Sequence, residues 1–163
     1  MNKTIIGIIA AIAILSGIIW FAKIDSQNNN SLPVKSNGTL VAEETNFDFG
    51  EISMAAGKVK HSFKIKNIGN ESVIINKVYT SCMCTTASLT INNKQFGPYG
   101  MAGHGLIPKI NQPVKPNEEI IIEAVFDPAA HGPAGAGQIK RIITIENNSE
   151  KQIELQFTAT VTP

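Results

Sequence analysis

Residues 153–161 read IELQFTATV and decide the fold class of this 163-residue chain. Apolar and polar side chains alternate along this stretch without a break, so on an extended backbone all five apolar residues point to one face. A half-buried antiparallel strand requires this alternation. The C-terminal end therefore predicts a β-strand that buries one face in a core.

The same period of two recurs in shorter runs through the preceding residues. Phe63 and Ile65 alternate with lysines, and residues 72–80 are rich in β-branched side chains. Further strands are predicted at 47–52, 120–126 and 138–146. Asn147-Asn148-Ser149 predicts a hairpin between the last two strands. Short strands without an amphipathic helix predict an all-β fold, an immunoglobulin-like β-sandwich of about seven strands over residues 46–163.

The N-terminal end has a different pattern. Residues 4–22 contain no charged side chain, and as a helix with a rise of about 1.5 Å per residue they would span roughly 29 Å, close to the hydrocarbon thickness of a bilayer. We expect residues 1–25 to form a single transmembrane anchor, with the following residues outside the cytoplasm; a cleaved signal segment is the alternative. Residues 26–45 are polar and irregular, which predicts a flexible linker.

Composition and motifs exclude several classes of function. The chain has 14 basic and 13 acidic residues, a net charge of +1, and so lacks the basic excess of a nucleic-acid-binding protein. It contains no G-x-S-x-G nucleophile elbow, no phosphate-binding P-loop and no dinucleotide fingerprint. We therefore expect a protein that is not an enzyme.

The two cysteines carry the clearest chemical signal. Cys82 and Cys84 flank Met83 at the end of the strand that begins near Ser72. If that strand continues, both sulfurs point to the same side. Three interpretations are open: small buried apolar side chains, a strained disulfide, or a pair of thiolate ligands for Cu(I) or Zn²⁺.

Two loops bring further soft ligands toward the cysteines. Met101 and His104 lie in a long glycine- and proline-rich segment after the Cys-x-Cys motif, and His131 lies in a second such loop before Gln138. In an immunoglobulin-like sandwich the cysteine strand runs antiparallel to the strand from Gln138, so the cysteines and both loops meet at one pole. The third histidine, His61, is in phase with Phe63 and is expected to be a structural residue at a strand end. The candidate metal ligands are Cys82, Cys84, His104 and His131, with Met101 or Met83 as an auxiliary ligand.

Four sequence elements together resemble a known family. They are FDFGEI at 47–52, F-x-I-x-N-x-G at 63–69, SCMCT at 81–85 and FDP at 126–128. The chain from Thr45 to Pro163 is similar to the bacterial immunoglobulin-like domain of unknown function fifteen-seventy-three, whose broader relatives are the Hydin-type domains. The resemblance implies an immunoglobulin-like fold and an exported, often membrane- or lipid-anchored location, but no activity. Met83 replaces the glycine that commonly lies between the two cysteines in this family.

Three functions follow from these patterns. The first is a membrane-anchored, extracytoplasmic and non-catalytic module that binds Cu(I) or Zn²⁺ through the cysteine, histidine and methionine cluster. The second is a metal-free module that binds another protein of the cell envelope through its sheet edges or loops. The third is a thiol–disulfide role for the cysteine pair.

Overall fold

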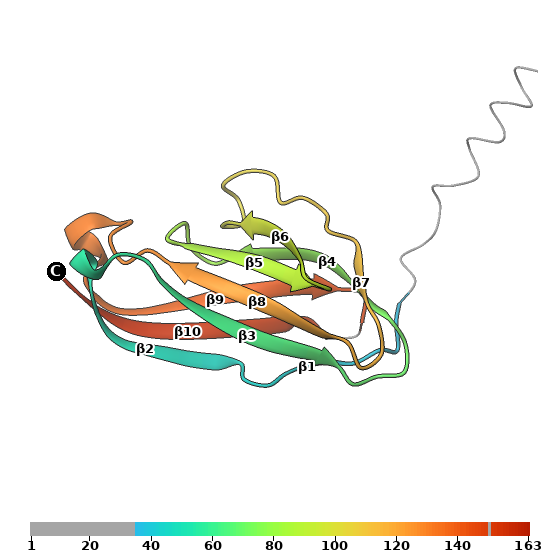
Figure 1. Ribbon diagram of the computed structural model, residues 1–163. Coiled ribbons are helices and arrows are strands. Elements are labelled where there is room, and N and C mark those ends of the chain that lie inside the picture. Colours follow the sequence, from blue (N-terminus) through green and yellow to red (C-terminus); the bar gives the residue numbers. More distant parts are fainter. Residues whose placement is uncertain (1–34, 150) are drawn as a thin grey trace, which may run out of the picture. The chain divides into compact units, whose positions relative to one another are not determined.

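The computed structural model describes residues 35–149 and 151–163, which form two five-stranded β-sheets and almost no helix (Figure 1). The first sheet has the order β1 (Leu40–Ala42), β3 (Val59–Asn67), β8 (Glu119–Phe126), β5 (Thr85–Ile91) and β6 (Lys94–Tyr99). The second has the order β2 (Asn46–Ser53), β10 (Ile153–Thr162), β9 (Gly137–Asn147), β4 (Val73–Thr80) and β7 (Gln112–Val114). Two short 3₁₀ helices, η2 (Met54–Ala56) and η3 (Gly132–Gly135), complete the described elements.

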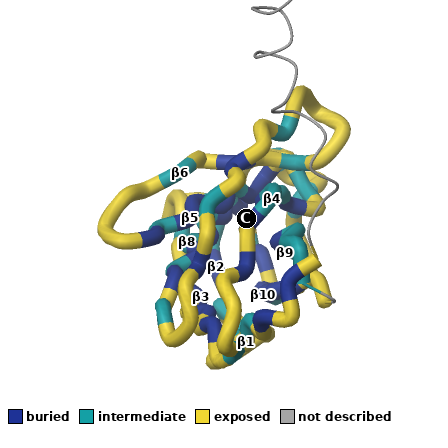
Figure 2. The backbone as a smooth tube through the Cα atoms, turned by 90° about the vertical axis from the view of Figure 1, so that its right-hand side faces the viewer, coloured by how far each residue is buried: buried dark blue, intermediate teal, exposed yellow. Residues whose placement is uncertain are grey.

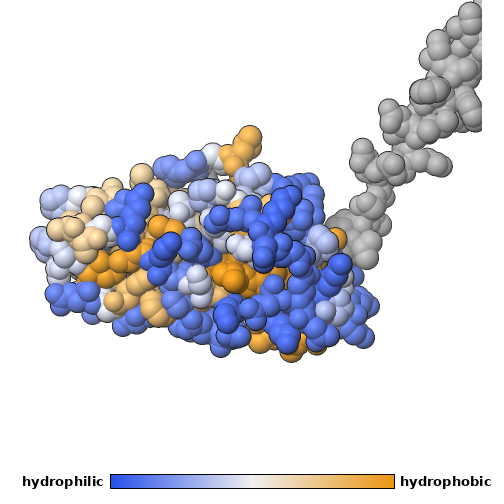
Figure 3. Space-filling model, in the orientation of Figure 1, coloured by the Kyte–Doolittle hydropathy of each residue, from blue (hydrophilic) through white to orange (hydrophobic). Residues whose placement is uncertain are grey.

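The two sheets share one hydrophobic core, as in a β-sandwich. Alternate residues of β10 are buried, as the alternation at 153–161 predicts, and Phe157 is fully buried together with Phe63 and Phe126. Figure 2 shows the buried positions mainly on the strands, where exposed positions lie between them. The face drawn in Figure 3 is mainly hydrophilic, with separate hydrophobic patches. The all-β class and the two-sheet arrangement are therefore confirmed.

The structure has more strands than the sequence predicts. β5, β6 and β7 lie in the region between residues 85 and 114, most of which was expected to be a long loop, and β1 lies inside the expected linker. β1, β6 and β7 are edge strands with one neighbour each. Such strands need no strict alternation, because only part of their surface packs on the core.

The pairing of β4 with β9 fixes the position of the cysteines. The two strands are antiparallel, with Thr80 opposite Ile143, as expected. The end of β4 and the start of β9 therefore lie at the same pole of the sandwich, at the left in Figure 1.

The predicted membrane anchor lies outside the described residues. Within residues 35–149 and 151–163, the structure has no helix with the length and apolar character needed to cross a bilayer.

Candidate functional site

The Cys-x-Cys motif forms a turn between the two sheets. β4 ends at Thr80 and β5 begins at Thr85, so the strand does not continue through the cysteines. The amide of Thr85 donates to the carbonyl of Cys82 at 3.1 Å, which closes the turn. The buried hydroxyl of Thr80 lies 3.0 Å from the carbonyl oxygens of both Cys82 and Thr85. The chain turns because it must leave one sheet and enter the other.

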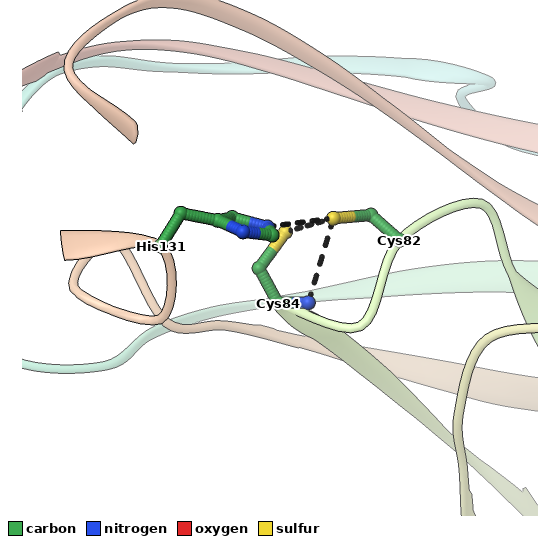
Figure 4. A group of neighbouring side chains, drawn as sticks. All are labelled: Cys82, Cys84 and His131. Carbon is green, nitrogen blue, oxygen red and sulfur yellow. Dashed lines mark hydrogen bonds between the residues drawn. The ribbon is translucent and has the colours of Figure 1, made fainter. Parts of the chain in front are cut away.

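This turn brings both sulfurs next to the imidazole of His131. The Sγ atoms of Cys82 and Cys84 are 2.7 Å apart, and both thiols are free. The Nε2 atom of His131 lies 3.2 Å from the Sγ atom of Cys82 (Figure 4). His131 comes from the loop between β8 and β9 and immediately precedes η3. The sulfur and nitrogen atoms of these three residues all lie within 4.8 Å of one another, and we call them the Cys–His cluster.

Arg141 adds a cation that the sequence analysis did not include. Its Nε atom donates to the Sγ atom of Cys84 at 3.1 Å, and its Nη1 atom donates to the carbonyl of Lys140 at 2.9 Å. Arg141 lies on β9 in phase with the buried residues Ile143 and Ile145, so its side chain leaves the core-facing side of the strand. A cationic residue in phase with apolar ones was the signal that could have identified it.

The surroundings shift the pKa values of the two thiols in opposite directions. Burial alone would raise the pKa of Cys82, but hydrogen bonds from Cys84 and His131 and the charge of Arg141 outweigh it and lower that pKa to about 7. Burial and the hydrogen bond to Cys82 raise the pKa of Cys84, although Arg141 acts in the opposite direction. The half-buried Cys82 is therefore the more acidic thiol of the pair.

The other predicted ligands lie outside the Cys–His cluster. His104 and Met101 line a separate pocket of about 400 Å³, together with Tyr99, Leu106 and neighbouring glycines and prolines. Met101 does approach the cysteine turn, because its segment forms a bridge with Thr80. Met83 lies within the turn itself and is 59% exposed. Of the cysteines and histidines predicted as ligands, the structure joins Cys82, Cys84 and His131 in one group of potential metal ligands.

His61 lies on β3, and its partners include Phe47 and Glu44. Its ring stacks on Phe47, with 3.5 Å between the ring centroids, and its Nε2 atom lies 2.6 Å from a carboxylate oxygen of Glu44. Both contacts agree with the expectation that His61 serves the structure of the domain.

The Cys–His cluster offers two kinds of chemistry. Two sulfurs and one imidazole nitrogen are ligands for a soft or borderline metal ion. Two adjacent thiols, one of them more exposed and more acidic, are also the requirement for thiol–disulfide exchange.

The chain matches solved structures from several organisms. A protein of unknown function from Porphyromonas gingivalis W83 is 18% identical with a TM-score of 0.56, and the match covers 82% of this chain and 51% of that one. This chain thus spans about half of that protein. The ASH/PapD-like domain 7 of human CEP192 is 11% identical with a TM-score of 0.45, and the match covers 83% and 92% of the two chains. At 18% identity, the Porphyromonas gingivalis structure supports the fold alone.

Curated proteins give no match to this chain. A family model matches residues 40–99, which include the Cys-x-Cys turn but neither His131 nor Arg141. The match ends well before Pro163, the limit expected from the resemblance. Residues 40–99 match the model of the family described as protein of unknown function (DUF1573).

Proposed function

We propose that the Cys–His cluster binds one soft metal ion, Cu(I) in preference to Zn²⁺. The observation that carries this proposal is the convergence of two sulfurs and one imidazole nitrogen within 4.8 Å. These atoms come from two connections that are 47 residues apart in the sequence, between Cys84 and His131. Thiolate and imidazole are the protein ligands that Cu(I) and Zn²⁺ share.

The number and positions of the ligands suit a three-coordinate ion. A metal–sulfur bond is about 2.3 Å long and a metal–imidazole bond about 2.0 Å, so one ion can reach all three atoms after the sulfurs separate. Cys82 is half-buried, and rotation of its side chain provides that separation. Structural zinc sites almost always use four protein ligands, one more than this cluster offers.

The charge of Arg141 favours a monovalent ion. Two thiolates with one Cu(I) ion carry one net negative charge, which the guanidinium 3.1 Å from Cys84 neutralises. With Zn²⁺ the two thiolates are already neutralised, and the guanidinium adds an uncompensated positive charge in a half-buried place. The ion pair of Lys58 with Asp127, at 4.0 Å, brings no net charge to the same pole.

We also propose that residues 1–25 anchor the protein in a membrane and hold the cluster outside the cytoplasm. The uncharged run at residues 4–22 supports this location. A site there could exchange copper with other proteins of the cell envelope.

Competition for Cu(I) tests the proposed site. The reduced full chain is titrated against a chromophoric Cu(I) chelator, and we expect one ion per chain. Cys82→Ser, Cys84→Ser and His131→Gln should each weaken binding by at least about tenfold, because each removes one ligand. His104→Gln is the matched control and should leave the affinity unchanged. A full chain that leaves all Cu(I) with the chelator, or equal affinity in all four variants, would refute the proposal.

A further inference from the structure

The two cysteines differ in their access to a reagent in solution. Cys84 is 3% exposed, whereas Cys82 is only half-buried. Their sulfurs are in contact at 2.7 Å while both are free thiols. A reagent can therefore reach one sulfur, and that sulfur already touches the second.

Hydrogen bonds hold the backbone of the turn while the side chains remain able to rotate. Thr80 and Thr85 bond to the carbonyl of Cys82, and the amide of Asp127 donates to the carbonyl of Cys84 at 2.9 Å. A disulfide bond is about 2.05 Å long, so the sulfurs must approach by roughly 0.7 Å from their 2.7 Å separation. Small rotations of the two side chains can supply this movement without unfolding the turn.

We propose that the metal-free Cys–His cluster is a thiol–disulfide exchange site, with Cys82 as the attacking cysteine and Cys84 as the resolving cysteine. The substrate class is a compound with an accessible disulfide bond. This proposal goes beyond metal binding and does not depend on it.

The reaction proceeds in two steps. The Cys82 thiolate attacks one sulfur of the substrate disulfide, a mixed disulfide forms, and the first substrate thiolate leaves and takes up a proton. Cys84 then loses its proton, its sulfur attacks that of Cys82, and the second substrate thiolate leaves. The protein gives up two electrons and two protons and gains one disulfide bond, and the substrate disulfide becomes two thiols.

His131 and Arg141 have different positions in this scheme. The Nε2 atom of His131 lies 3.2 Å from the sulfur of the attacking cysteine, and the Nε atom of Arg141 lies 3.1 Å from that of the resolving cysteine. Each sulfur thus has its own nitrogen partner, which can stabilise negative charge as the sulfur reacts. The disulfide state uses both metal-ligating sulfurs, so oxidation and metal binding exclude each other.

Oxidised glutathione is the probe for this proposal. The reduced full chain is incubated with it in the presence of a metal chelator, and the products are followed by mass spectrometry after acid quenching. We expect the wild type to lose two hydrogens and to accumulate no stable glutathione adduct. Cys84→Ser should stop at a mixed disulfide on Cys82, and Cys82→Ser should react at least tenfold more slowly because Cys84 is buried.

The variants give a clear decision even if one of them folds poorly. Equal rates of adduct formation in Cys82→Ser and Cys84→Ser would overturn the assignment of the two roles. A wild type that keeps a glutathione adduct, or that does not react, would overturn the exchange site itself. Because a chelator is present throughout, these results are independent of the copper titration, and either proposal can fail alone.

Discussion

Replacement of Arg141 by glutamine tests the charge argument directly. Two unit charges 3.1 Å apart interact by roughly 5 kcal/mol at an effective dielectric constant of about 20 and by roughly 1.3 kcal/mol at that of water. Arg141 is half-buried, and a hydrogen bond to a charged group contributes about 1.5–3 kcal/mol. We therefore expect Arg141→Gln to weaken Cu(I) binding by about 10- to 150-fold.

The assay compares two metals in the same variant. Cu(I) and Zn²⁺ affinities are measured by chelator competition, and the Zn²⁺ affinity should not fall, since the zinc dithiolate carries no net charge for Arg141 to neutralise. Lys140→Gln is the matched control, because Lys140 is the exposed neighbour of Arg141 on β9 and its replacement removes the same formal charge.

Two outcomes would refute this reasoning. If Lys140→Gln weakens Cu(I) binding as much as Arg141→Gln does, the effect is a general charge effect and not a contact with Cys84. If the affinities of Arg141→Gln for Cu(I) and for Zn²⁺ fall equally, Arg141 acts only by holding the ligands in position and not through its charge. Thermal unfolding of each variant shows whether the fold is retained.

Two further predictions concern the acidity of Cys82 and the stability of the sandwich. The pKa of Cys82 is lowered to about 7, so the rate of its alkylation by iodoacetamide in metal-free protein should be half-maximal near pH 7. Below that pH the rate should fall about tenfold per pH unit. The rate is measured by peptide mapping, and a midpoint near pH 9 would contradict this prediction. Asn67→Ala should lower the free energy of unfolding by about 2–4 kcal/mol, because the buried amide of Asn67 donates to the carbonyls of Glu71 and Val114 at 2.8 and 2.9 Å. The exposed Asn70→Ala should change it by less than about 0.5 kcal/mol in the same denaturant titration.

The strands with regular alternation could be predicted from the sequence, because each has one face in the core. The predicted strand at 138–146 is observed as β9 (Gly137–Asn147), and that at 120–126 as β8 (Glu119–Phe126). β6 could not be predicted in this way, because it is an edge strand that contains Gly97 and Pro98. The Asn92-Asn93 pair before β6 was a usable signal, because asparagine tolerates positive φ. The two residues have φ of 50° and 62°, as a two-residue hairpin turn requires.

The candidate site was predicted in part, since topology alone brings His131 to the cysteines. The antiparallel pairing of β4 and β9 was enough for that step. The separation of His104 from the cluster could not be predicted, because the path of residues 100–111 depends on contacts such as the bridge between Met101 and Thr80. Arg141 was missed because its position in the predicted strand at 138–146 was interpreted as structural, although it is a charged residue within an apolar face.

The position of the cluster at a junction of the two sheets explains why its backbone can stay fixed while its chemistry changes. Ser81 donates to Ile142 of β9 at 2.9 Å, and Asp127, which follows β8, donates to Cys84 at 2.9 Å. These bonds attach the turn to both sheets through atoms that neither metal nor disulfide chemistry would use. If both proposals hold, the metal-bound and disulfide states share one backbone conformation, and the conformational change between them is a rotation of the two cysteine side chains. The outcome would then depend on the supply of Cu(I) and of oxidising disulfides around the protein, without any refolding of the sandwich.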